Sequence, residues 1–509
     1  MSIDKNKLYQ KFKINPYATG YANGKHVGKK ENGFEIQITS PIDEEIISTL
    51  REDSAEDVEQ IVSAARRAFD TGPWSGMSVD QRKTIMYEIS NILRANAEEL
   101  AFLETINSGL TMSHVEHFHV VRTAFNFEFF ADVAGQARGE SYSQTQPYLS
   151  VVTQEPVGVA ALIGPWNAPL ALCSMKIASC IAFGNTCVLK PSEYTPLSLL
   201  RVIELIHETN IPKGVVNLVN GRGHITGEAL VRHPDIDVVS FTGGTVTGSS
   251  IAAAAGDGLK AVALELGGKS ANIITKSANL ERALDGALLG IYSNNGQQCL
   301  AGSRIILENS IADEFIEKFV QRSKNINVGN PLDPLTEIGP VCYQKHMERI
   351  LSYSETARMD GDEILTGGVR DNNHPTGLYL QPTAVLAKTN ASRVCQEEIF
   401  GPFVSFLTFN DLEESIAIAN DSDFGLVGYV WSEHLPTITK VSQGIRAGTI
   451  WVNTPMTREL RAPFGGFKKS GIGRDSAQDC MDFFTEKKTV TIPLTDFSMP
   501  KWGTQNNKN

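Results

Sequence analysis

Short apolar segments alternate with helical segments between residues 157 and 266, and this alternation restricts the possible folds more than any other feature of the sequence. We predict strands at residues 157–163, 186–189, 215–219, 238–241 and 261–266. Strands separated by helices favour a mostly parallel sheet with helices on both faces. The sequence therefore predicts an α/β fold for this region.

Polar or glycine-rich turns follow four of these strands. In an open parallel sheet, ligands bind beyond the carboxyl ends of the strands. We therefore expect ligand contacts from the turns at 164–167, 190–193, 220–223 and 242–244.

Two of these turns could bind a dinucleotide. Glycines at 221, 223 and 227 depart from the usual G-x-G-x-x-G spacing and are weak evidence alone. Residues 241–248 separate a strand from a predicted helix at 249–255, so backbone N–H groups could face a pyrophosphate. A tight strand-to-helix turn is the alternative. Lys190 and Glu193 favour a nucleotide, because a Glu there can accept hydrogen bonds from two ribose hydroxyls.

Cys299 lies in a segment rich in Gly, Asn and Gln, at 292–304, between two apolar segments. A free cysteine is usually buried and packs like a small apolar side chain, and we keep that interpretation for the other six cysteines. The polar surroundings of Cys299 make it a candidate nucleophile. Glu265 ends an apolar strand and precedes two glycines. Alone it would suggest a buried ion pair, but together with Cys299 it is a candidate general base.

Composition excludes several classes of protein. The chain has 509 residues, which predicts two or three domains. Its formal charge of −12 disfavours a nucleic-acid partner. No run of about 18 apolar residues predicts a membrane span, and residues 1–13 lack the apolar core of a signal peptide. Seven cysteines without a C-x-x-C pair indicate a reducing, cytoplasmic location.

Three histidines, at 114, 117 and 119, could suggest a metal site. No fourth ligand is indicated nearby, so we favour a polar helix face over a metal site. Upstream of them, Ser54 with Asp57 and Ser78 with Gln81 predict the first turns of two helices.

A second α/β region is expected at 267–466, with helices at 278–289, 312–324 and 344–358. Residues 488–494 are strand-like and lie near the carboxyl terminus. An exposed strand of this kind can pair with another subunit.

Seven motifs occur in one order along the chain: P-W-N (165–167), K-P-S-E (190–193), F-T-G-x-x-x-x-G (241–248), E-L-G-G-K (265–269), N-x-G-Q-x-C-x-A-G-S-R (294–304), E-E-I-F-G-P (397–402) and P-F-G-G-x-K-x-S-G (463–471). With these motifs the sequence resembles the NAD(P)-dependent aldehyde dehydrogenases from about residue 35 to its end. Seven ordered motifs make a chance resemblance negligible.

The resemblance implies three parts. A Rossmann-like, NAD-binding domain would comprise residues 1–133 and 154–266, and an α/β catalytic domain residues 267–466. A small β oligomerisation element would comprise residues 134–153 and 484–503. The resemblance also implies self-association as a homodimer or homotetramer.

The resemblance assigns roles to individual residues. Cys299 would be the nucleophile and Glu265 the general base, while Asn167 and the Cys299 backbone N–H would bind the oxyanion. Lys176 matches a lysine near the proton-relay path. The implied cofactor-binding residues are Trp166, Lys190, Ser192, Glu193, Gly223, Gly227, Phe241, Thr242, Gly243, Gly244, Gly248, Leu266, Gly267, Glu398 and Phe400.

The proposed chemistry requires these residue types. A thiol with a reference pKa of about 8.5 must lose its proton to attack a carbonyl. Hydrogen-bond donors aimed at the developing alkoxide lower the barrier, each by about 3 kcal/mol. The resulting thioester must be hydrolysed, and Glu265 would activate the water. Its presence disfavours relatives that transfer the acyl group to coenzyme A or phosphate.

Two features concern the cofactor. Gly244 stands where the family often has Ser, so a hydroxyl contact to the pyrophosphate would be missing. Glu193 would repel a 2′-phosphate on the adenosine ribose, so NAD is expected rather than NADP.

The expected substrate residues flank the motifs and are Ala168, Leu172, Met175, Gln298, Leu300 and Arg458. Residues 453–461 and the tail at 499–503 look most like the (5-carboxymethyl-)2-hydroxymuconic-semialdehyde dehydrogenase branch, which would place the protein in aromatic catabolism. Arg458 suits a carboxylated semialdehyde, although it could instead pair with Glu459 or another surface acid.

Two alternatives remain open from the sequence. A general or betaine-type aldehyde dehydrogenase is possible, but a quaternary ammonium group favours acidic or aromatic neighbours over Arg458. A binding protein without activity would be expected to lose Cys299 or Glu265, and both are present.

Overall fold

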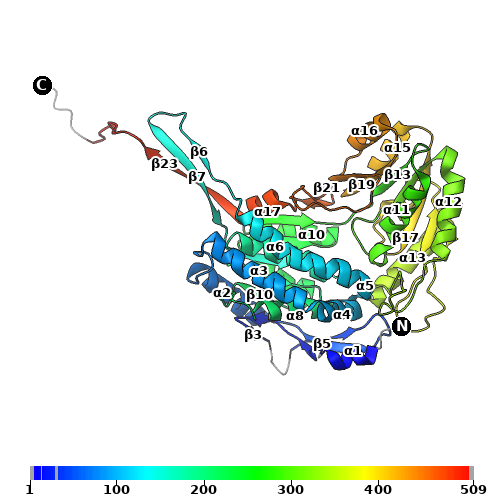
Figure 1. Ribbon diagram of the computed structural model, residues 1–509, viewed down its shortest axis with the longest axis horizontal. Coiled ribbons are helices and arrows are strands. Elements are labelled where there is room, and N and C mark those ends of the chain that lie inside the picture. The colour runs from blue at the N-terminus through cyan, green and yellow to red at the C-terminus, as the bar shows by residue number, and fades with distance from the viewer. Residues whose placement is uncertain (1–4, 13, 29–32, 504–509) are drawn as a thin grey trace.

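The computed structural model describes residues 5–12, 14–28 and 33–503. Figure 1 shows two α/β lobes and a long arm that projects from one of them. The first lobe contains an eight-stranded sheet, the second a seven-stranded sheet, and the arm a three-stranded sheet. The expected α/β class is confirmed. Residues 1–4 and 13 of the predicted N-terminal tail lie outside the described residues.

Five parallel strands form the centre of the first sheet, in the order β12 (Ala261–Glu265), β11 (Val238–Thr242), β8 (Val159–Ile163), β9 (Thr186–Lys190) and β10 (Val216–Leu218). These are the five strands expected from the sequence. Three short antiparallel strands complete the edges: β22 (Gly471–Ile472), β2 (Tyr21–Ala22) and β3 (Lys25–His26).

The register of these strands places three polar side chains at one edge. In the strand register Lys190 lies opposite Ile163, and Thr242 lies opposite Glu265. The carboxyl ends of β8, β9, β11 and β12 are therefore aligned at one edge of the sheet. Parallel strands collect their following turns at this edge. The turns expected to bind a ligand are thus neighbours.

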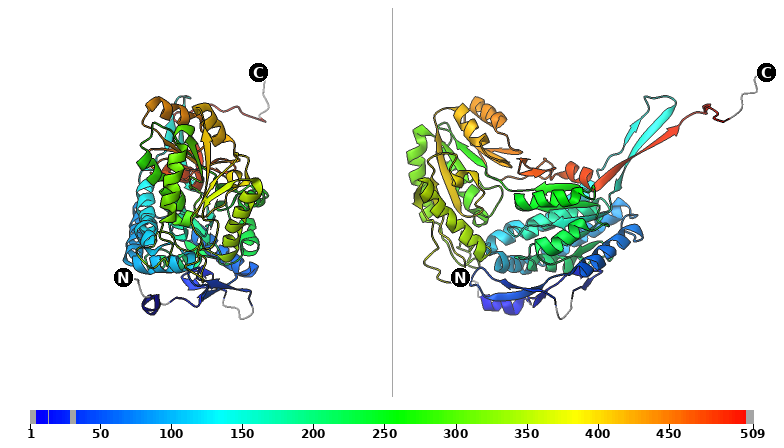
Figure 2. Two further views of the ribbon diagram at one scale, coloured as in Figure 1. Left: turned by 90° about the vertical axis from the view of Figure 1, so that its right-hand side faces the viewer. Right: turned by 180° about the vertical axis from the view of Figure 1, so that it is seen from behind.

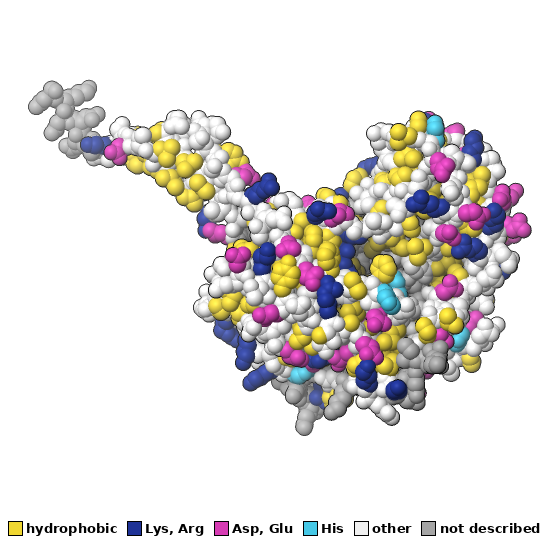
Figure 3. All heavy atoms as spheres, in the orientation of Figure 1, with side chains coloured by type: hydrophobic (Ala, Val, Ile, Leu, Met, Phe, Trp, Pro, Cys, Tyr) yellow, Lys and Arg dark blue, Asp and Glu magenta, His cyan; other side chains and the backbone are white. Residues whose placement is uncertain are grey.

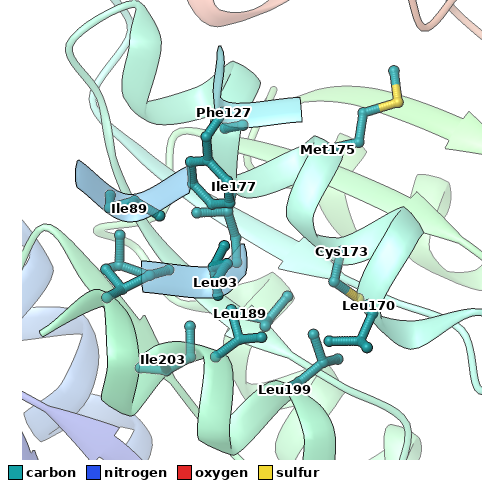
Figure 4. Close-up of a cluster of buried hydrophobic side chains, with 14 of the residues drawn as sticks. Ile89, Leu93, Phe127, Leu170, Cys173, Met175, Ile177, Leu189, Leu199 and Ile203 are labelled. Atoms are coloured by element: carbon teal, nitrogen blue, oxygen red, sulfur yellow. The ribbon is translucent and has the colours of Figure 1, made fainter. Parts of the chain in front are cut away.

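Helices cover both faces of the first sheet. Helices α2 (Ala55–Asp70) and α3 (Val79–Ala95) begin with the capping boxes expected at Ser54 and Ser78. A hydrophobic cluster packs α3, α6 (Val121–Ala134), α7 (Pro169–Ala182) and α8 (Leu197–Ile206) together. Figure 4 shows part of this cluster, with the Met175 side chain extending away from Leu93 and Leu189.

Among the described residues, eleven further elements complete this lobe. They are α1 (Lys5–Lys11), β1 (Tyr17–Ala18), β4 (Glu35–Thr39), β5 (Ile46–Arg51), α4 (Ala97–Ser108), α5 (Met112–His114), η1 (Val115–Val120), η2 (Gly223–Gly227), α9 (Glu228–Arg232), α10 (Thr245–Gly256) and α17 (Ala477–Phe484).

The second sheet has the order β15 (Glu363–Thr366), β16 (Thr383–Leu386), β17 (Phe403–Phe409), β14 (Arg304–Glu308), β13 (Ala271–Ile274), β19 (Val427–Trp431) and β20 (Thr449–Val452). All but β15 are parallel. The other elements of the second lobe are the helices α11 (Leu280–Tyr292), η3 (Ser293–Gly296), α12 (Asn309–Lys324), α13 (Gln344–Asp360), α14 (Arg393–Gln396), α15 (Leu412–Asn420) and α16 (Leu435–Gly444). Strands β18 (Phe424–Gly425) and β21 (Phe467–Lys468) form a separate two-stranded sheet.

In the second sheet, the segments of interest lie at the amino ends of the strands, whereas in the first sheet they lie at the carboxyl ends. Residues 267–270 lead into β13, residues 297–303 into β14, and residues 398–402 into β17. The segments that carry the candidate nucleophile and Glu398 therefore precede strands rather than follow them. The sequence indicated Cys299 and Glu398 as site residues, but it did not indicate that their segments precede strands of the second sheet.

The arm consists of β6 (Glu140–Tyr142), β7 (Tyr148–Pro156) and β23 (Thr485–Pro493), which pair antiparallel. It extends away from both lobes in Figure 2. Apolar side chains lie exposed along it, including Val490, Ile492, Leu494 and Phe497, as Figure 3 shows.

The three histidines have different hydrogen-bond and packing partners in this fold, and the ring centres of His114 and His119 lie 5.1 Å apart. His119 Nδ1 lies 2.7 Å from Glu104 Oε1, and His117 Nδ1 lies 2.8 Å from the Ser113 carbonyl oxygen. The His114 ring stacks on Phe118. Over the described ranges, no group of three or more His, Cys, Asp or Glu side chains could hold a metal ion. No described helix is long and apolar enough to cross a membrane.

Candidate active site

A cavity of about 870 Å³ lies between the two lobes. Its wall combines the carboxyl-edge turns of the first sheet with the segments that precede β14 and β17. It contains Cys299, Glu265 and Asn167. Of the expected cofactor and substrate residues, it contains Trp166, Leu172, Lys190, Ser192, Glu193, Gly223, Gly227, Phe241, Thr242, Gly243, Gly244, Leu266, Gly267, Glu398 and Phe400.

The segment before Cys299 has an unusual backbone. Asn294, Asn295 and Gly296 all have positive φ, at 54°, 57° and 69°. Asn and Gly tolerate this region better than other residues. The Asn295 side chain fixes the turn, because Nδ2 donates to the carbonyls of Gly109 and Pro340 while Oδ1 accepts from Gly339 N–H.

The two glycines after Glu265 allow close backbone approach. A Cβ at Gly268 would lie 2.5 Å from the Cys299 carbonyl oxygen. A Cβ at Gly267 would lie 2.4 Å from Glu398 Oε2, and Gly268 N–H donates to Glu398 Oε1 at 2.8 Å. These glycines therefore bring the end of β12, the cysteine segment and Glu398 together.

The Cys299 thiol is held in its protonated form. Burial, followed by the charges of Glu398 and Glu265, raises its pKa to about 12. Its side chain nevertheless remains partly exposed in the cavity, whereas the other six cysteines are buried. All seven cysteines are described, and none forms a disulfide.

Glu265 has the environment of a general base. Burial raises the pKa of its carboxyl well above the usual value, the Asp475 charge raises it further, and Lys176 and Arg458 oppose this shift. Its Oε2 atom is buried without a hydrogen-bond partner among the described residues. A Cβ at Gly465 would lie 2.7 Å from Oε1, so a glycine is needed there.

Asn167 is held by the segment that precedes Cys299. Its Nδ2 donates to the Gln297 carbonyl at 2.7 Å, and its own carbonyl accepts from Asn294 Nδ2 at 2.9 Å. An amide nitrogen carries two hydrogens, so a second donor remains for a ligand oxygen.

Lys176 does not line the cavity. Its buried Nζ donates from α7 to Ser240 Oγ of β11 at 2.8 Å, which places it against the face of the first sheet. The charge of Lys176 nevertheless lowers the pKa of Glu265 and so opposes the effect of burial. Asp475, which the sequence did not single out, acts on Glu265 from another side.

The nucleotide half of the cavity fits a dinucleotide. Lys190 Nζ lies 3.7 Å from Glu193 Oε2. Gly244 precedes the first turn of α10 without a side-chain cap, and no atom lies within 4 Å of a Cβ placed at Gly244 or at Gly223. This leaves room for a phosphate near the helix N-terminus.

Gly248 differs from the other expected cofactor residues. It does not line the cavity, and a Cβ there would lie 2.4 Å from Leu266 Cδ2. The glycine in this motif therefore permits α10 to pack against the strand that leads to Glu265.

Most of the expected substrate residues lie behind or beside the cavity wall. Ala168, Met175, Gln298, Leu300 and Arg458 are not part of its lining. Gln298 Nε2 bonds to Ser293 Oγ at 2.9 Å, and the Leu300 carbonyl accepts from Tyr429 Oη at 2.6 Å. Leu300 packs in one hydrophobic cluster with Cys299, Met456 and Phe464.

Arg458 does not pair with Glu459, whose carboxylate bonds to Arg461. Instead its Nη2 donates to the Asp475 carbonyl at 2.9 Å, and its guanidinium lies 3.9 Å from the Phe464 ring centre. Its Nε is buried without a partner among the described residues.

A second arginine, Arg122, lies close to Arg458. Burial lowers the pKa of Arg122 to about 10, and the charge of Arg458 contributes to this shift. Its Nε donates to Asn126 Oδ1 at 2.9 Å, and Asn126 in turn bonds to Ser174 of α7. No carboxylate in the described structure lies within 4 Å of either guanidinium. Arg122 was not among the residues expected from the sequence, although it is the only basic residue of the mostly apolar helix α6.

Comparison with known proteins agrees with this geometry. A sequence profile of the aldehyde dehydrogenase family matches residues 28–490. The chain is 40% identical to betaine aldehyde dehydrogenase of Bacillus subtilis (strain 168) over 456 residues, which is 89% of this chain and 93% of that protein. It is 39% identical to 5-carboxymethyl-2-hydroxymuconate semialdehyde dehydrogenase of Escherichia coli over 453 residues, covering 88% and 95% of the two.

The fold also matches a solved structure. The NAD+ complex of an aldehyde dehydrogenase from Bacillus cereus superposes with a TM-score of 0.94 at 36% identity, covering 97% of this chain and 100% of that one. The profile spans most of the chain, and residues from all seven of the motifs that define the resemblance lie in the cavity wall or against it. The chain therefore belongs to the aldehyde dehydrogenase family.

Proposed function

We propose that this protein oxidises an aldehyde to a carboxylic acid with NAD, and that the aldehyde is a carboxylated semialdehyde such as a hydroxymuconic semialdehyde. Membership in the family, and the placement of Cys299, Glu265 and Asn167 in one cavity, support the reaction. The observation that supports the substrate class is the pair Arg122 and Arg458, two guanidiniums that form no ion pair with a carboxylate among the described residues, although the Asp475 and Glu265 charges act on Arg458.

Cys299 begins the proposed reaction. Its sulfur attacks the aldehyde carbon and a C–S bond forms, while the thiol proton passes to the nearest base in the cavity, water or a carboxylate. The carbonyl oxygen becomes an alkoxide, which Asn167 Nδ2 and the Cys299 N–H can stabilise. Bound NAD supplies the acceptor for the hydride that leaves the same carbon. The product on the enzyme is a thioester.

Glu265 completes the proposed reaction. As a carboxylate it removes a proton from water, the hydroxide adds to the thioester carbon, and the C–S bond breaks to return the thiolate. Burial and the Asp475 charge raise the pKa of its carboxyl, and a higher pKa makes the carboxylate a stronger base towards water.

We propose NAD rather than NADP. Lys190 and Glu193, which line the cavity 3.7 Å apart, would hold the adenosine ribose, and Glu193 would repel a 2′-phosphate. Glu398, whose pKa burial raises to about 7, would accept a hydrogen bond from the nicotinamide ribose in addition to the one from Gly268 N–H.

The arginine pair favours a distal carboxylate over a betaine-type substrate. A planar guanidinium can bind a carboxylate through two parallel hydrogen bonds. A trimethylammonium group beside two cations would be repelled. The relatives named betaine and 5-carboxymethyl-2-hydroxymuconate semialdehyde dehydrogenase are about equally similar to this chain, so the distinction rests on these side chains.

Turnover of two aldehydes tests the proposal. NADH formation at 340 nm is measured with a hydroxymuconic semialdehyde and with an aliphatic aldehyde of similar length that lacks the carboxylate. We expect kcat/KM to be at least about tenfold higher for the semialdehyde, since a charged hydrogen-bond pair contributes about 1.5–3 kcal/mol. Equal kcat/KM values would leave a general aldehyde dehydrogenase, and equal use of NADP would contradict the cofactor assignment.

Arginine variants test the substrate class directly. Arg458→Ala is expected to raise KM for the semialdehyde by about 10- to 100-fold and to change KM for the uncharged aldehyde little. Arg122→Ala should act in the same direction. Arg461→Ala is the matched control, because Arg461 is exposed and paired with Glu459. Equal losses for both aldehydes would show that Arg458 is structural.

We also propose that the arm mediates self-association. Strand β23 is exposed along nearly its whole length, and it and β6 are edge strands. Exposed edges carrying apolar side chains favour pairing with another chain. Sedimentation velocity at micromolar concentration should detect a dimer or larger species. A monomer under these conditions would contradict the proposal.

A further inference from the structure

Helix α13 holds the loop that carries Glu398 and Phe400. His346 Nε2 lies 2.7 Å from the Phe400 carbonyl oxygen, and Arg349 Nη2 donates to the Glu398 carbonyl at 2.6 Å. The two side chains are three residues apart and share one helix face. Side chains of one helix therefore bond to the backbone carbonyls of Glu398 and Phe400, two residues apart in the loop.

The conformation at Phe400 needs such support. Its φ is +64°, in the left-handed region that a residue with a side chain adopts only at an energetic cost. In this conformation the Phe400 ring lies 5.2 Å from the Trp166 ring, and both line the cavity. The His346 ring also contacts Trp166, at 5.0 Å between ring centres.

The same loop touches the nucleophile segment. A Cβ at Gly296 would lie 2.3 Å from the carbonyl group of Gly401, so the two backbones are in direct contact. On the other side, a Cβ at Gly401 would lie 2.5 Å from Ile350 Cδ1 of α13. The loop is therefore enclosed between α13 and the segment that leads to Cys299.

His346 is suited to a constant hydrogen bond. A backbone carbonyl can only accept, so His346 Nε2 must carry the hydrogen. Burial lowers the pKa of this imidazole to about 4, so it is neutral at pH 7 and the contact does not depend on charge.

We infer that His346 is a positioning residue, which holds Phe400 and Glu398 in the arrangement that receives the nicotinamide half of NAD. The inference rests on the proposed function, because it requires NAD to bind in this cavity. His346 lines the cavity, but its hydrogen bond is to the loop, so its effect on the reacting atoms passes through Phe400 and Glu398.

Two substitutions separate the hydrogen bond from packing. His346→Leu keeps an apolar contact with Trp166 but removes the donor. His346→Gln replaces it with an amide N–H. Lys345→Ala is the matched control, because Lys345 is exposed on the same helix. The Kd of NAD is measured by titration calorimetry on the enzyme without aldehyde, and the NADH burst rate is measured at saturating NAD.

We expect His346→Leu to weaken NAD binding by about 3- to 10-fold and to slow the NADH burst, since one neutral hydrogen bond has about that effect. His346→Gln should restore both to within about twofold, and Lys345→Ala should change neither. Arg349→Met, an exposed substitution that removes the second contact, should also weaken NAD binding and provides the test if the leucine variant does not fold.

Other outcomes overturn the inference. If wild-type protein binds NAD but His346→Leu binds it equally well and keeps the burst rate, His346 has no positioning role. If His346→Gln is as impaired as His346→Leu, the effect is one of packing. If wild-type protein does not bind NAD, the proposed function fails together with this inference.

Discussion

Replacement of Cys299 by alanine is expected to lower kcat for aldehyde oxidation by at least about 10⁴-fold, because no other side chain can form the covalent intermediate. The other six cysteines are buried, so none can take its place. The Kd of NAD should change little. The measurement is NADH formation over hours at high enzyme concentration, with NAD binding followed separately by calorimetry.

Cys180→Ala is the matched control. Cys180 is buried and its Sγ contacts the Thr186 carbonyl, away from the cavity. Its loss should lower stability by about 1–2 kcal/mol through lost packing and leave kcat within about twofold. Activity within tenfold of wild type in Cys299→Ala would contradict the nucleophile assignment.

Replacement of Glu265 by glutamine is expected to block the reaction at a later step. Loss of a general base typically lowers the rate by about 10²- to 10⁴-fold. Because hydrolysis of the thioester is the step affected, the first turnover should still release about one NADH per active site. The expected trace is a burst followed by very slow steady-state turnover, measured by stopped-flow absorbance.

The pH dependence of this step has a definite sign. Glu265 acts as a base only when deprotonated, and burial and Asp475 raise its pKa. Steady-state kcat should therefore rise with pH through that raised pKa and fall below it. Glu265→Gln should lose this dependence, whereas Glu459→Gln, at an exposed carboxylate paired with Arg461, should keep it. A Glu265→Gln variant without a burst would contradict a role limited to hydrolysis.

The order of strands and helices could be predicted from local patterns. Alternating apolar segments identified all five parallel strands of the first sheet, since buried strands need continuous apolar residues. Capping residues Ser54 and Ser78 marked two helix starts, because their side chains bond to N–H groups within the same turn. These signals are local and need no tertiary information.

The positions of the substrate residues could not be predicted in this way. The sequence suggested Arg458 and offered Glu459 as its partner, yet Glu459 bonds to Arg461 and Arg458 lies against Phe464. Arg122 is 336 positions earlier in the chain and becomes its neighbour only when α6 packs near the 454–461 loop. Long-range pairs of this kind depend on packing.

The sequence by itself determined the five parallel strands of the first sheet, two helix starts, the seven motifs and the residue types of the candidate nucleophile and base, because each depends on residues close together in the chain. Only the tertiary structure decided that Lys176 lies behind the sheet at Ser240, that Gly248 packs against Leu266, and that His346 holds Phe400. These contacts join segments brought together by two sheets whose opposite edges face one cavity. Their formation depends on burial and register across the whole fold, which no short stretch of residues encodes.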